Sequence, residues 1–237
     1  MIRSSILSKK SCLTHNSQTD HQQDPRCMVE NFTALNEKKM RIGILGGTFN
    51  PIHLGHVKMG IDAHDEFLLS KVLYIPTGRP PHKHNNEIEQ DYHRLAMIDL
   101  AISMPYMRLD DMEINRQGMT YTIDTLRALE KKYPNSERYY IIGSDTLFML
   151  DTWKDFHAVL GLTNFIVFLR LGDDEKAVAN SIDFYNTLGK KKICLASNYG
   201  LDVSSTQIRF NIAHGLSLCD MLPQKVIEYI GENKIYL

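Results

Sequence analysis

Two histidines, His53 and His56, are the side chains whose type and spacing point most directly to chemistry. They follow an apolar run over 41–45, which is typical of a strand, and the glycine pair Gly46-Gly47. A strand that passes through glycines into a helix can hold a phosphate, because the backbone approaches closely and the helix N-terminus offers free N–H groups. Residues i and i+3 share a helix face, so both imidazoles can point at one anion. The spacing predicts that they neutralise charge on a transferred phosphoryl group.

The glycine spacing differs from that of the common phosphate loops. No Gly-Lys-Ser/Thr follows, which excludes a Walker loop, and Gly43, Gly46 and Gly47 do not fit the G-x-G-x-x-G pattern. The alternative is a glycine turn with incidental core histidines, but that interpretation leaves the glycines unexplained. We therefore predict that both histidines face phosphates.

A second anion site is predicted near the end of the sequence. Ser204 or Ser205 can cap the helix that the pattern predicts over 205–213. Thr206, with Arg209 one turn later, completes an anion clamp, because a planar guanidinium suits polyphosphate. Capping and anion binding are compatible roles here.

A third stretch, Gly143-Ser144-Asp145, directly follows the strand predicted over 138–142. In open α/β sheets, ligands bind beyond the carboxyl ends of the strands, so ribose or adenine contacts are expected here. The alternative is a turn in which Asp145 caps the next helix.

These residues are positioned by strands and helices that alternate along residues 40–237, which predicts a doubly wound, Rossmann-like α/β domain with a parallel sheet. In the first helix, Val57, Ile61, Phe67 and Leu68 are the predicted core residues. Strands are predicted over 41–45, 72–75, 107–109, 138–142, 165–169 and 192–195, and helices over 55–70, 91–103, 122–133, 174–188, 205–213 and 224–231.

Residues 1–39 differ from this pattern. They are rich in Ser, Gln, Asn and His, lack apolar periodicity, and precede Met40, which begins the first strand. We interpret them as a disordered extension, or as a start assigned too far upstream. A transit peptide is the alternative for residues 1–19, which are basic, contain several serines and have no acid.

Composition indicates an intracellular protein with no nucleic-acid or membrane partner. The 237 residues have a formal net charge of −1, with 43% hydrophobic and 23% charged residues. No apolar run approaches the ~18–20 residues of a transmembrane helix. The cysteines show no C-x-x-C spacing, which suits a reducing cytoplasm. The sequence does not determine an oligomeric state, and a homo-oligomer is an open alternative. The cysteines are Cys12, Cys27, Cys194 and Cys219.

The motif over 47–56, Gly-Thr-Phe-x-Pro-x-His-x-Gly-His, resembles the signature of nucleotidyltransferases that join a nucleoside triphosphate to a phosphorylated acceptor. The stretch over 203–209, Val-Ser-Ser-Thr-Gln-Ile-Arg, resembles their second signature. Segments 75–83, 116–126 and 152–156 are similar to bacterial nicotinate-nucleotide adenylyltransferase, so the resemblance covers essentially the whole chain from Met40.

The resemblance implies in-line attack by the 5′-phosphate of nicotinate mononucleotide on the α-phosphorus of ATP, with Mg²⁺ bridging the ATP phosphates and no covalent intermediate. It implies that the nicotinate carboxylate meets N–H groups near Thr120 and Tyr121, that Trp153 stacks on the pyridine, and that Lys83 faces a phosphate. From residue chemistry alone, Trp153 is equally a core residue. The implied catalytic residues are His53, His56 and Arg209, and the implied ATP-binding residues are Gly46, Gly47, Thr48, Phe49, Gly143, Ser144, Asp145, Ser204, Ser205 and Thr206.

Two departures and several alternatives accompany this interpretation. Asn50 stands where many members of the family have Asp, and Met119 stands where small residues or proline are commoner. His82-x-His84 suggests a transition metal, but no cysteine or carboxylate cluster completes such a site, so we expect no protein metal site. The alternative functions are phosphopantetheine or nicotinamide-mononucleotide adenylyl transfer, and a non-catalytic sensor of adenine nucleotides.

Overall fold

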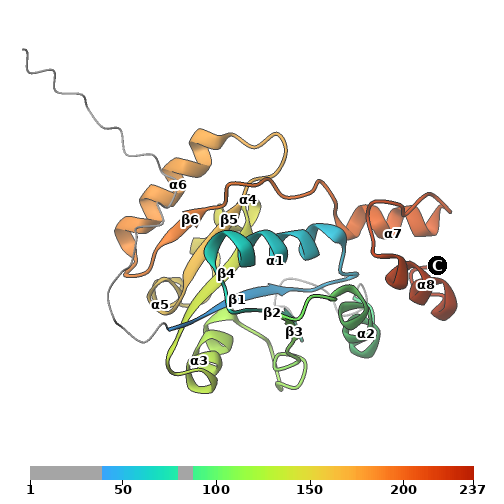
Figure 1. Ribbon diagram of the computed structural model, residues 1–237, viewed down its shortest axis with the longest axis horizontal. Helices are drawn as coiled ribbons and strands as arrows, with labels where there is room; N and C mark the ends of the chain where they lie inside the picture. The colour runs from blue at the N-terminus through green and yellow to red at the C-terminus, as the bar shows by residue number, and fades with distance from the viewer. Residues whose placement is uncertain (1–38, 80–87) are drawn as a thin grey trace, which may run out of the picture.

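A computed structural model of the protein describes residues 39–79 and 88–237, so the interpretation of residues 1–39 falls almost wholly outside it. Within the described residues, six parallel strands form one sheet in the order β3-β2-β1-β4-β5-β6 (Figure 1). The strands are β1 (Met40–Gly47), β2 (Lys71–Pro76), β3 (Met107–Leu109), β4 (Ser136–Gly143), β5 (Asn164–Phe168) and β6 (Ile193–Leu195).

Helices cover both faces of this sheet. Successive side chains of a strand point to opposite faces, so each strand contributes to two hydrophobic cores. In β2, Val72 and Tyr74 pack into one core, whereas Leu73 and Ile75 pack into the other. The doubly wound parallel architecture predicted from the sequence is therefore confirmed. The first core is closed by α1 (Leu54–Phe67), α2 (Asp91–Ala101), α7 (Ser205–Ala213) and α8 (Gln224–Asn233), and the second by α3 (Thr122–Lys132), α4 (Ser144–Leu147), α5 (Phe156–Leu162) and α6 (Glu175–Leu188).

Two local features differ from the prediction. The helical segments α4, η2 (Leu150–Thr152) and α5 lie between β4 and β5, where no helix was predicted. Segments this short depend on tertiary packing rather than on intrinsic propensity, so the sequence pattern carries little sign of them. Leu68 was predicted to be core and is 57% exposed, because α1 ends before it and its φ of 52° turns the chain. The next residue, Leu69, is buried instead.

The strand order places the point where the connections change direction between β1 and β4. From β1 the chain runs outward through β2 to β3, and then crosses back to β4 on the other side of β1. Gly47 ends β1 and Gly143 ends β4, so the predicted phosphate loop and the predicted ribose stretch meet at this switch point.

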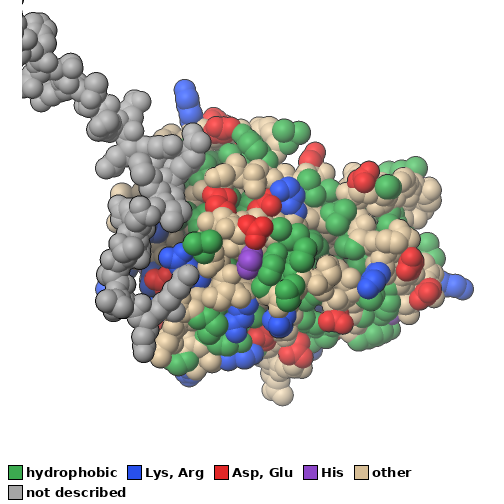
Figure 2. Space-filling model, in the orientation of Figure 1, with side chains coloured by type: hydrophobic (Ala, Val, Ile, Leu, Met, Phe, Trp, Pro, Cys, Tyr) green, Lys and Arg blue, Asp and Glu red, His purple; other side chains and the backbone are tan. Residues whose placement is uncertain are grey.

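The surface carries mixed charge over the face that Figure 2 presents, where acidic and basic side chains lie interspersed with hydrophobic ones. This agrees with the formal net charge of −1. Among residues 39–79 and 88–237, none of the helices combines the length and the apolar character that crossing a membrane requires.

Candidate active site

His53 and His56 lie together at the start of α1, as the i, i+3 spacing predicts. Their rings stack with centroids 3.6 Å apart and planes inclined by 26°. The His53 backbone N–H donates to Nδ1 of His56 at 3.3 Å, so the proton of a neutral His56 ring lies on Nε2, which is left to donate. Nδ1 of His53 is buried and has no hydrogen-bond partner. The Nε2 N–H of His56 is therefore a free donor at this helix N-terminus, whereas no hydrogen bond to Nδ1 fixes the tautomer of His53.

The environment keeps both imidazoles neutral. Burial, and secondarily the positive charge of Arg170, lowers the pKa of His53 from 6.5 to about 4. Burial also lowers the pKa of His56 well below its ordinary value, and His53 and Arg170 add to that effect. At pH 7 the two rings are therefore neutral imidazoles rather than cations.

Close approach explains two glycines of this motif. A Cβ on Gly46 would lie 2.1 Å from the hydroxyl oxygen of Tyr140, so the phenol fills the space beside the glycine turn. A Cβ on Gly55 would lie 3.0 Å from Nδ1 of His53. The Gly47 carbonyl accepts the Thr77 N–H at 2.8 Å, which ties the end of β1 to the loop after β2. Sequence reasoning missed Tyr140, whose burial raises its pKa and keeps the hydroxyl protonated.

The second motif is bonded directly to the first. Arg209 donates from Nη1 to the Asn50 carbonyl at 2.8 Å, and Nη2 lies 3.5 Å from the Thr206 hydroxyl. Ser205 donates from its hydroxyl to the Pro51 carbonyl at 2.9 Å. Of the two candidate caps of α7, the structure uses Ser204, whose hydroxyl oxygen accepts the Gln207 N–H at 3.2 Å. The predicted anion clamp therefore sits against the loop that carries the histidines.

A carboxylate follows the end of β4, and an arginine follows the end of the neighbouring strand β5. Asp145 makes an ion pair with Arg170, with Oδ2 and Nη2 2.7 Å apart, and no side chain caps the short helix α4. Ser144 is buried, and its hydroxyl has no hydrogen-bond partner. Sequence reasoning missed Arg170. Its signal is that it is the first charged residue beyond a buried strand, at the edge where ligands bind.

Thr48 and Phe49 connect the glycine turn to the histidines. The Thr48 carbonyl accepts a hydrogen bond from Nη1 of Arg94 at 2.7 Å. Phe49 is buried, and its ring meets that of His56 edge-on, with centroids 4.9 Å apart. In this structure, therefore, Phe49 supports a histidine rather than lining an open surface.

Two of the predicted acceptor residues, Thr120 and Tyr121, lie at the N-terminus of α3. Thr120 is buried and pairs twice with Arg79: the Thr120 N–H donates to the Arg79 carbonyl at 3.1 Å, and its hydroxyl accepts the Arg79 N–H at 3.0 Å. Tyr121 is the N-terminal cap residue of α3, and Nζ of Lys154 lies 4.2 Å from the centre of its ring. The Thr120 N–H is therefore engaged by Arg79, and in the first turn of α3 the Asp124 N–H is bonded to the Tyr121 carbonyl at 3.0 Å. The helix N-terminus at Thr122 and Ile123 is where an α-helix has no carbonyl partner of its own for its N–H groups.

Trp153 is partly buried at the rim of the second core. Its ring packs edge-on against Tyr140 at 5.6 Å and lies 6.3 Å from Phe165. Tyr140 thus spans from the glycine turn to Trp153 and joins the two predicted halves of the site. Lys83, the remaining acceptor residue, and the histidines at 82 and 84 lie outside the described residues.

The buried carboxylate of Glu113 packs beneath the N-terminal half of α3 and is hydrogen-bonded there. Glu113 accepts the Thr125 hydroxyl at 2.6 Å, and Arg116 also donates to that hydroxyl at 3.0 Å. Burial raises the pKa of Glu113, and the bond from Thr125 and the charge of Arg116 oppose this. A Cβ on Gly78 would lie 2.3 Å from the Glu113 carbonyl oxygen, so the loop after β2 packs tightly on this segment. In the part of the chain that the structure describes, no group of three or more His, Cys, Asp or Glu side chains is arranged to hold a metal ion.

Comparison with known proteins gives consistent results. A family model described as cytidylyltransferase-like matches residues 44–211. A probable nicotinate-nucleotide adenylyltransferase of Lachnoclostridium phytofermentans is 37% identical over 198 residues, covering 83% of this chain and 99% of the relative. One from Desulfitobacterium hafniense is 37% identical over 205 residues, covering 85% and 98%.

Solved structures agree at the level of the fold. Plasmodium falciparum nicotinic acid mononucleotide adenylyltransferase complexed with NaAD superposes with a TM-score of 0.68 at 20% identity, covering 83% of this chain and 97% of that one. The same protein complexed with APC gives a TM-score of 0.67 at 19% identity, over 83% and 97% of the two chains.

Proposed function

Since this chain belongs with the nicotinate-nucleotide adenylyltransferases of the cytidylyltransferase-like family, we propose that it transfers the adenylyl group of ATP to nicotinate mononucleotide. The products are nicotinic acid adenine dinucleotide and pyrophosphate, a step of NAD biosynthesis. The observation that carries the proposal is the joining of two motifs 154 residues apart, where Ser205 and Arg209 bind the loop that carries the histidines. The reaction consumes ATP, so the proposal includes a cytoplasmic location.

The chemistry is an in-line displacement at phosphorus. An oxygen of the acceptor's 5′-phosphate forms a bond to the α-phosphorus as the bond to the β-phosphate bridging oxygen breaks, and that oxygen leaves with its electron pair as part of pyrophosphate. The neutral N–H groups of His53 and His56 stabilise charge on the transferred phosphoryl group. Thr206 and Arg209 hold the β- and γ-phosphates, and Gly143 to Asp145 meet the nucleoside. Alignment and charge stabilisation suffice, because the acceptor phosphate is already a competent nucleophile.

Arg170 adds a second cation to this arrangement. It lies close enough to depress the pKa of both histidines, and it forms an ion pair with Asp145. We assign it to the balance of phosphate charge once nucleotide is bound. On the acceptor side, the N-terminus of α3 at Tyr121 receives the nicotinate carboxylate, and Trp153 stacks on the pyridine.

Nucleotidyl transfer uses a divalent metal, and we propose Mg²⁺. The donors gathered here are neutral imidazoles, hydroxyls and guanidinium groups, with Asp145 as the carboxylate, and they do not form a cage. This donor set fits a magnesium ion held mainly by the ATP phosphates and water. When bound, the ion neutralises charge on the triphosphate.

The test is magnesium-dependent pyrophosphate release from ATP, measured in parallel with nicotinate mononucleotide, nicotinamide mononucleotide and phosphopantetheine. We expect a strong preference for the nicotinate acceptor, because the α3 N-terminus favours a carboxylate over a neutral amide. A preference for either other acceptor would keep the chemistry and overturn the specificity. No release with any acceptor, from protein that still binds ATP, would instead support a nucleotide sensor.

A further inference from the structure

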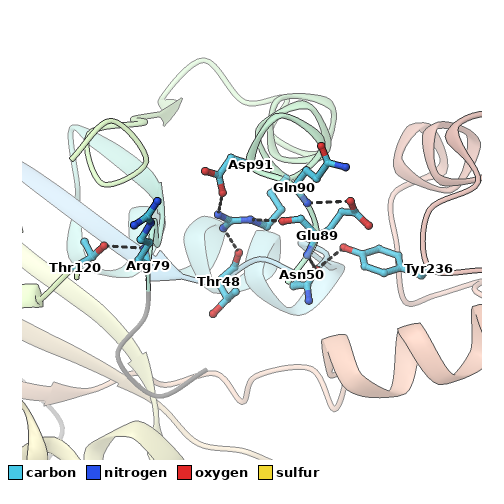
Figure 3. A network of polar contacts seen from close by, with 9 residues as sticks. Thr48, Asn50, Arg79, Glu89, Gln90, Asp91, Thr120 and Tyr236 are labelled. Atoms are coloured by element: carbon cyan, nitrogen blue, oxygen red, sulfur yellow. Dashed lines mark hydrogen bonds and ion pairs between the residues drawn. The ribbon is translucent and has the colours of Figure 1, made fainter. Parts of the chain in front are cut away.

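The loop between the glycine turn and the histidines is hydrogen-bonded by groups from residues 89–94 and from the C-terminal residues. Arg94 binds the Thr48 carbonyl, as described above, and two donors converge on Asn50 (Figure 3). The side-chain oxygen Oδ1 of Asn50 accepts the Glu89 N–H at 3.0 Å and the Tyr236 hydroxyl at 2.8 Å. Since the Asn50 carbonyl also accepts from Arg209, this residue joins the segment just before α2, α7 and the C-terminal residues of the chain.

Phe49 lies between Thr48 and Asn50, and the hydrogen bonds to these two residues hold its backbone conformation. Its φ of 48° is in the left-handed region, which is unfavourable for a side chain of this size. Such a conformation persists only where the surroundings fix it, and the bonds to Thr48 and Asn50 do so on either side. Because the Phe49 ring abuts His56, the placement of that imidazole depends on the bonds to both residues.

The two side chains that bind Thr48 and Asn50, Arg94 and Tyr236, differ in how many other contacts hold them. Arg94 is fully buried, and it also bonds the Glu89 carbonyl at 3.2 Å and the Asp91 carboxylate at 2.5 Å, so it is part of the scaffold of α2. Tyr236 contributes a single hydroxyl. Burial raises its pKa, so the group remains a protonated donor at working pH. The neighbouring Ile235 is buried in the first core and fixes where that hydroxyl lies.

We propose that Tyr236 is a positioning residue: through Asn50 it sets the loop that carries Phe49 and so places His56 for phosphoryl transfer. The proposal rests on the proposed function for its kinetic consequence. It also gives a role to Asn50, which the resemblance marked as a departure from the family pattern. One amide oxygen serves both donors, and a carboxylate oxygen would serve them equally.

The variant Tyr236→Phe keeps the ring and removes only the hydroxyl. The matched control is Tyr229→Phe, because the Tyr229 hydroxyl lies 2.9 Å from Nδ1 of His93 and links α8 to α2 without touching the loop. Loss of one hydrogen bond predicts a fall in kcat of about 3- to 10-fold for Tyr236→Phe. We expect Tyr229→Phe to keep wild-type kcat, with both variants showing similar small losses of Tm.

A double-mutant cycle isolates the route through Asn50. In an Asn50→Ala background, adding Tyr236→Phe is expected to change kcat by less than about twofold, because the hydroxyl acts through the amide that is already gone. Wild-type kinetics in Tyr236→Phe, an equal fall in the control, or an undiminished effect in the Asn50→Ala background would each overturn the proposal.

Failure of the proposed function is separable from failure of this inference. Wild-type protein that is inactive with every acceptor would overturn the function alone. The ATP dissociation constants of the wild type, Tyr236→Phe and Tyr229→Phe would then carry the test, with weaker ATP binding expected in Tyr236→Phe and not in Tyr229→Phe. Equal ATP affinity in both variants and the wild type would overturn the positioning role.

Discussion

The ATP half and the acceptor half of the site are built in different ways. In the ATP half, three carbonyls of the loop 48–51 are each bound by a side chain from a distant segment: Arg94, Arg209 or Ser205. In the acceptor half, the backbones at Thr120 and Arg79 pair with each other, and the aromatic side chains lie at the rim of the second core. The loop there also exposes an apolar side chain, with Met119 59% accessible.

This difference separates chemistry from recognition. In the mechanism we propose, the loop 48–51 faces the reacting phosphates, and the bonds to its carbonyls fix it as stabilisation of a transition state requires. The same proposal has the acceptor half meet a ring with apolar surface and a carboxylate with helix N–H groups. We therefore expect changes in the first half to lower kcat, and changes in the second to raise the KM of one substrate.

The largest effect is expected where the fixed half meets the phosphates. Replacing His56 with Ala removes the Nε2 donor, and loss of one such donor lowers kcat by roughly 100- to 1,000-fold. Folding should lose only about 1 kcal/mol, because the His53 N–H loses its acceptor at the start of α1. Steady-state kinetics and urea unfolding of the same preparation measure the two quantities.

His64→Ala is the matched control for His56→Ala, since His64 lies in the last turn of the same helix and stacks on Tyr106 instead. This variant should retain wild-type turnover. Near-normal turnover in folded His56→Ala protein would remove the histidine from the mechanism and, with it, the distinction between the two halves.

A smaller effect tests whether the fixed half holds neutral imidazoles. The pKa of His53 is lowered to about 4 in the folded protein, mainly by burial, so between pH 6.5 and 4 the unfolded chain binds more protons. The free energy of unfolding must then fall as the pH drops through this window, by up to about 3 kcal/mol. His53→Gln, which does not titrate, should lose less stability between pH 7 and pH 4.5.

Urea unfolding of both proteins at the two pH values provides the measurement. Parallel losses in the wild type and His53→Gln would mean that His53 titrates normally, and that the loop opens to water. In that case the ATP half would be no more fixed than the acceptor half.

How much of this could be predicted from the sequence depends on whether a contact is local. The i, i+3 spacing of His53 and His56 and the cap before α7 are local patterns, and the structure has both. The parallel sheet also follows from alternating periodicity, and the relatives confirm the adenylyltransferase resemblance. Arg170 and Tyr236 reach the site only through the strand order and the docking of α8, which no local pattern encodes.

Because its contacts are not local in sequence, the role of Trp153, as a core residue or as a ligand-stacking residue, could not be decided from residue chemistry. A half-buried tryptophan is compatible with a core role and with a ligand role, and in the structure Trp153 contacts Tyr140 and Phe165 while remaining partly exposed. The roles of the remaining predicted residues stay proposals, although geometry brings His53, Arg209 and the Gly143–Asp145 stretch to one end of the sheet.

The smallest effect should come from the acceptor half and should fall on one substrate. Trp153→Leu keeps an apolar side chain against Tyr140 but removes the stacking face, so the KM for nicotinate mononucleotide should rise about tenfold. The KM for ATP and the saturated kcat should change by less than about twofold, because the bonds that hold the loop 48–51 are untouched. Trp153→Phe restores a ring and should recover most of the acceptor affinity. If Trp153→Leu instead lowered Tm and weakened both substrates alike, Trp153 would be a core residue, and the pyridine would bind another surface of the acceptor half.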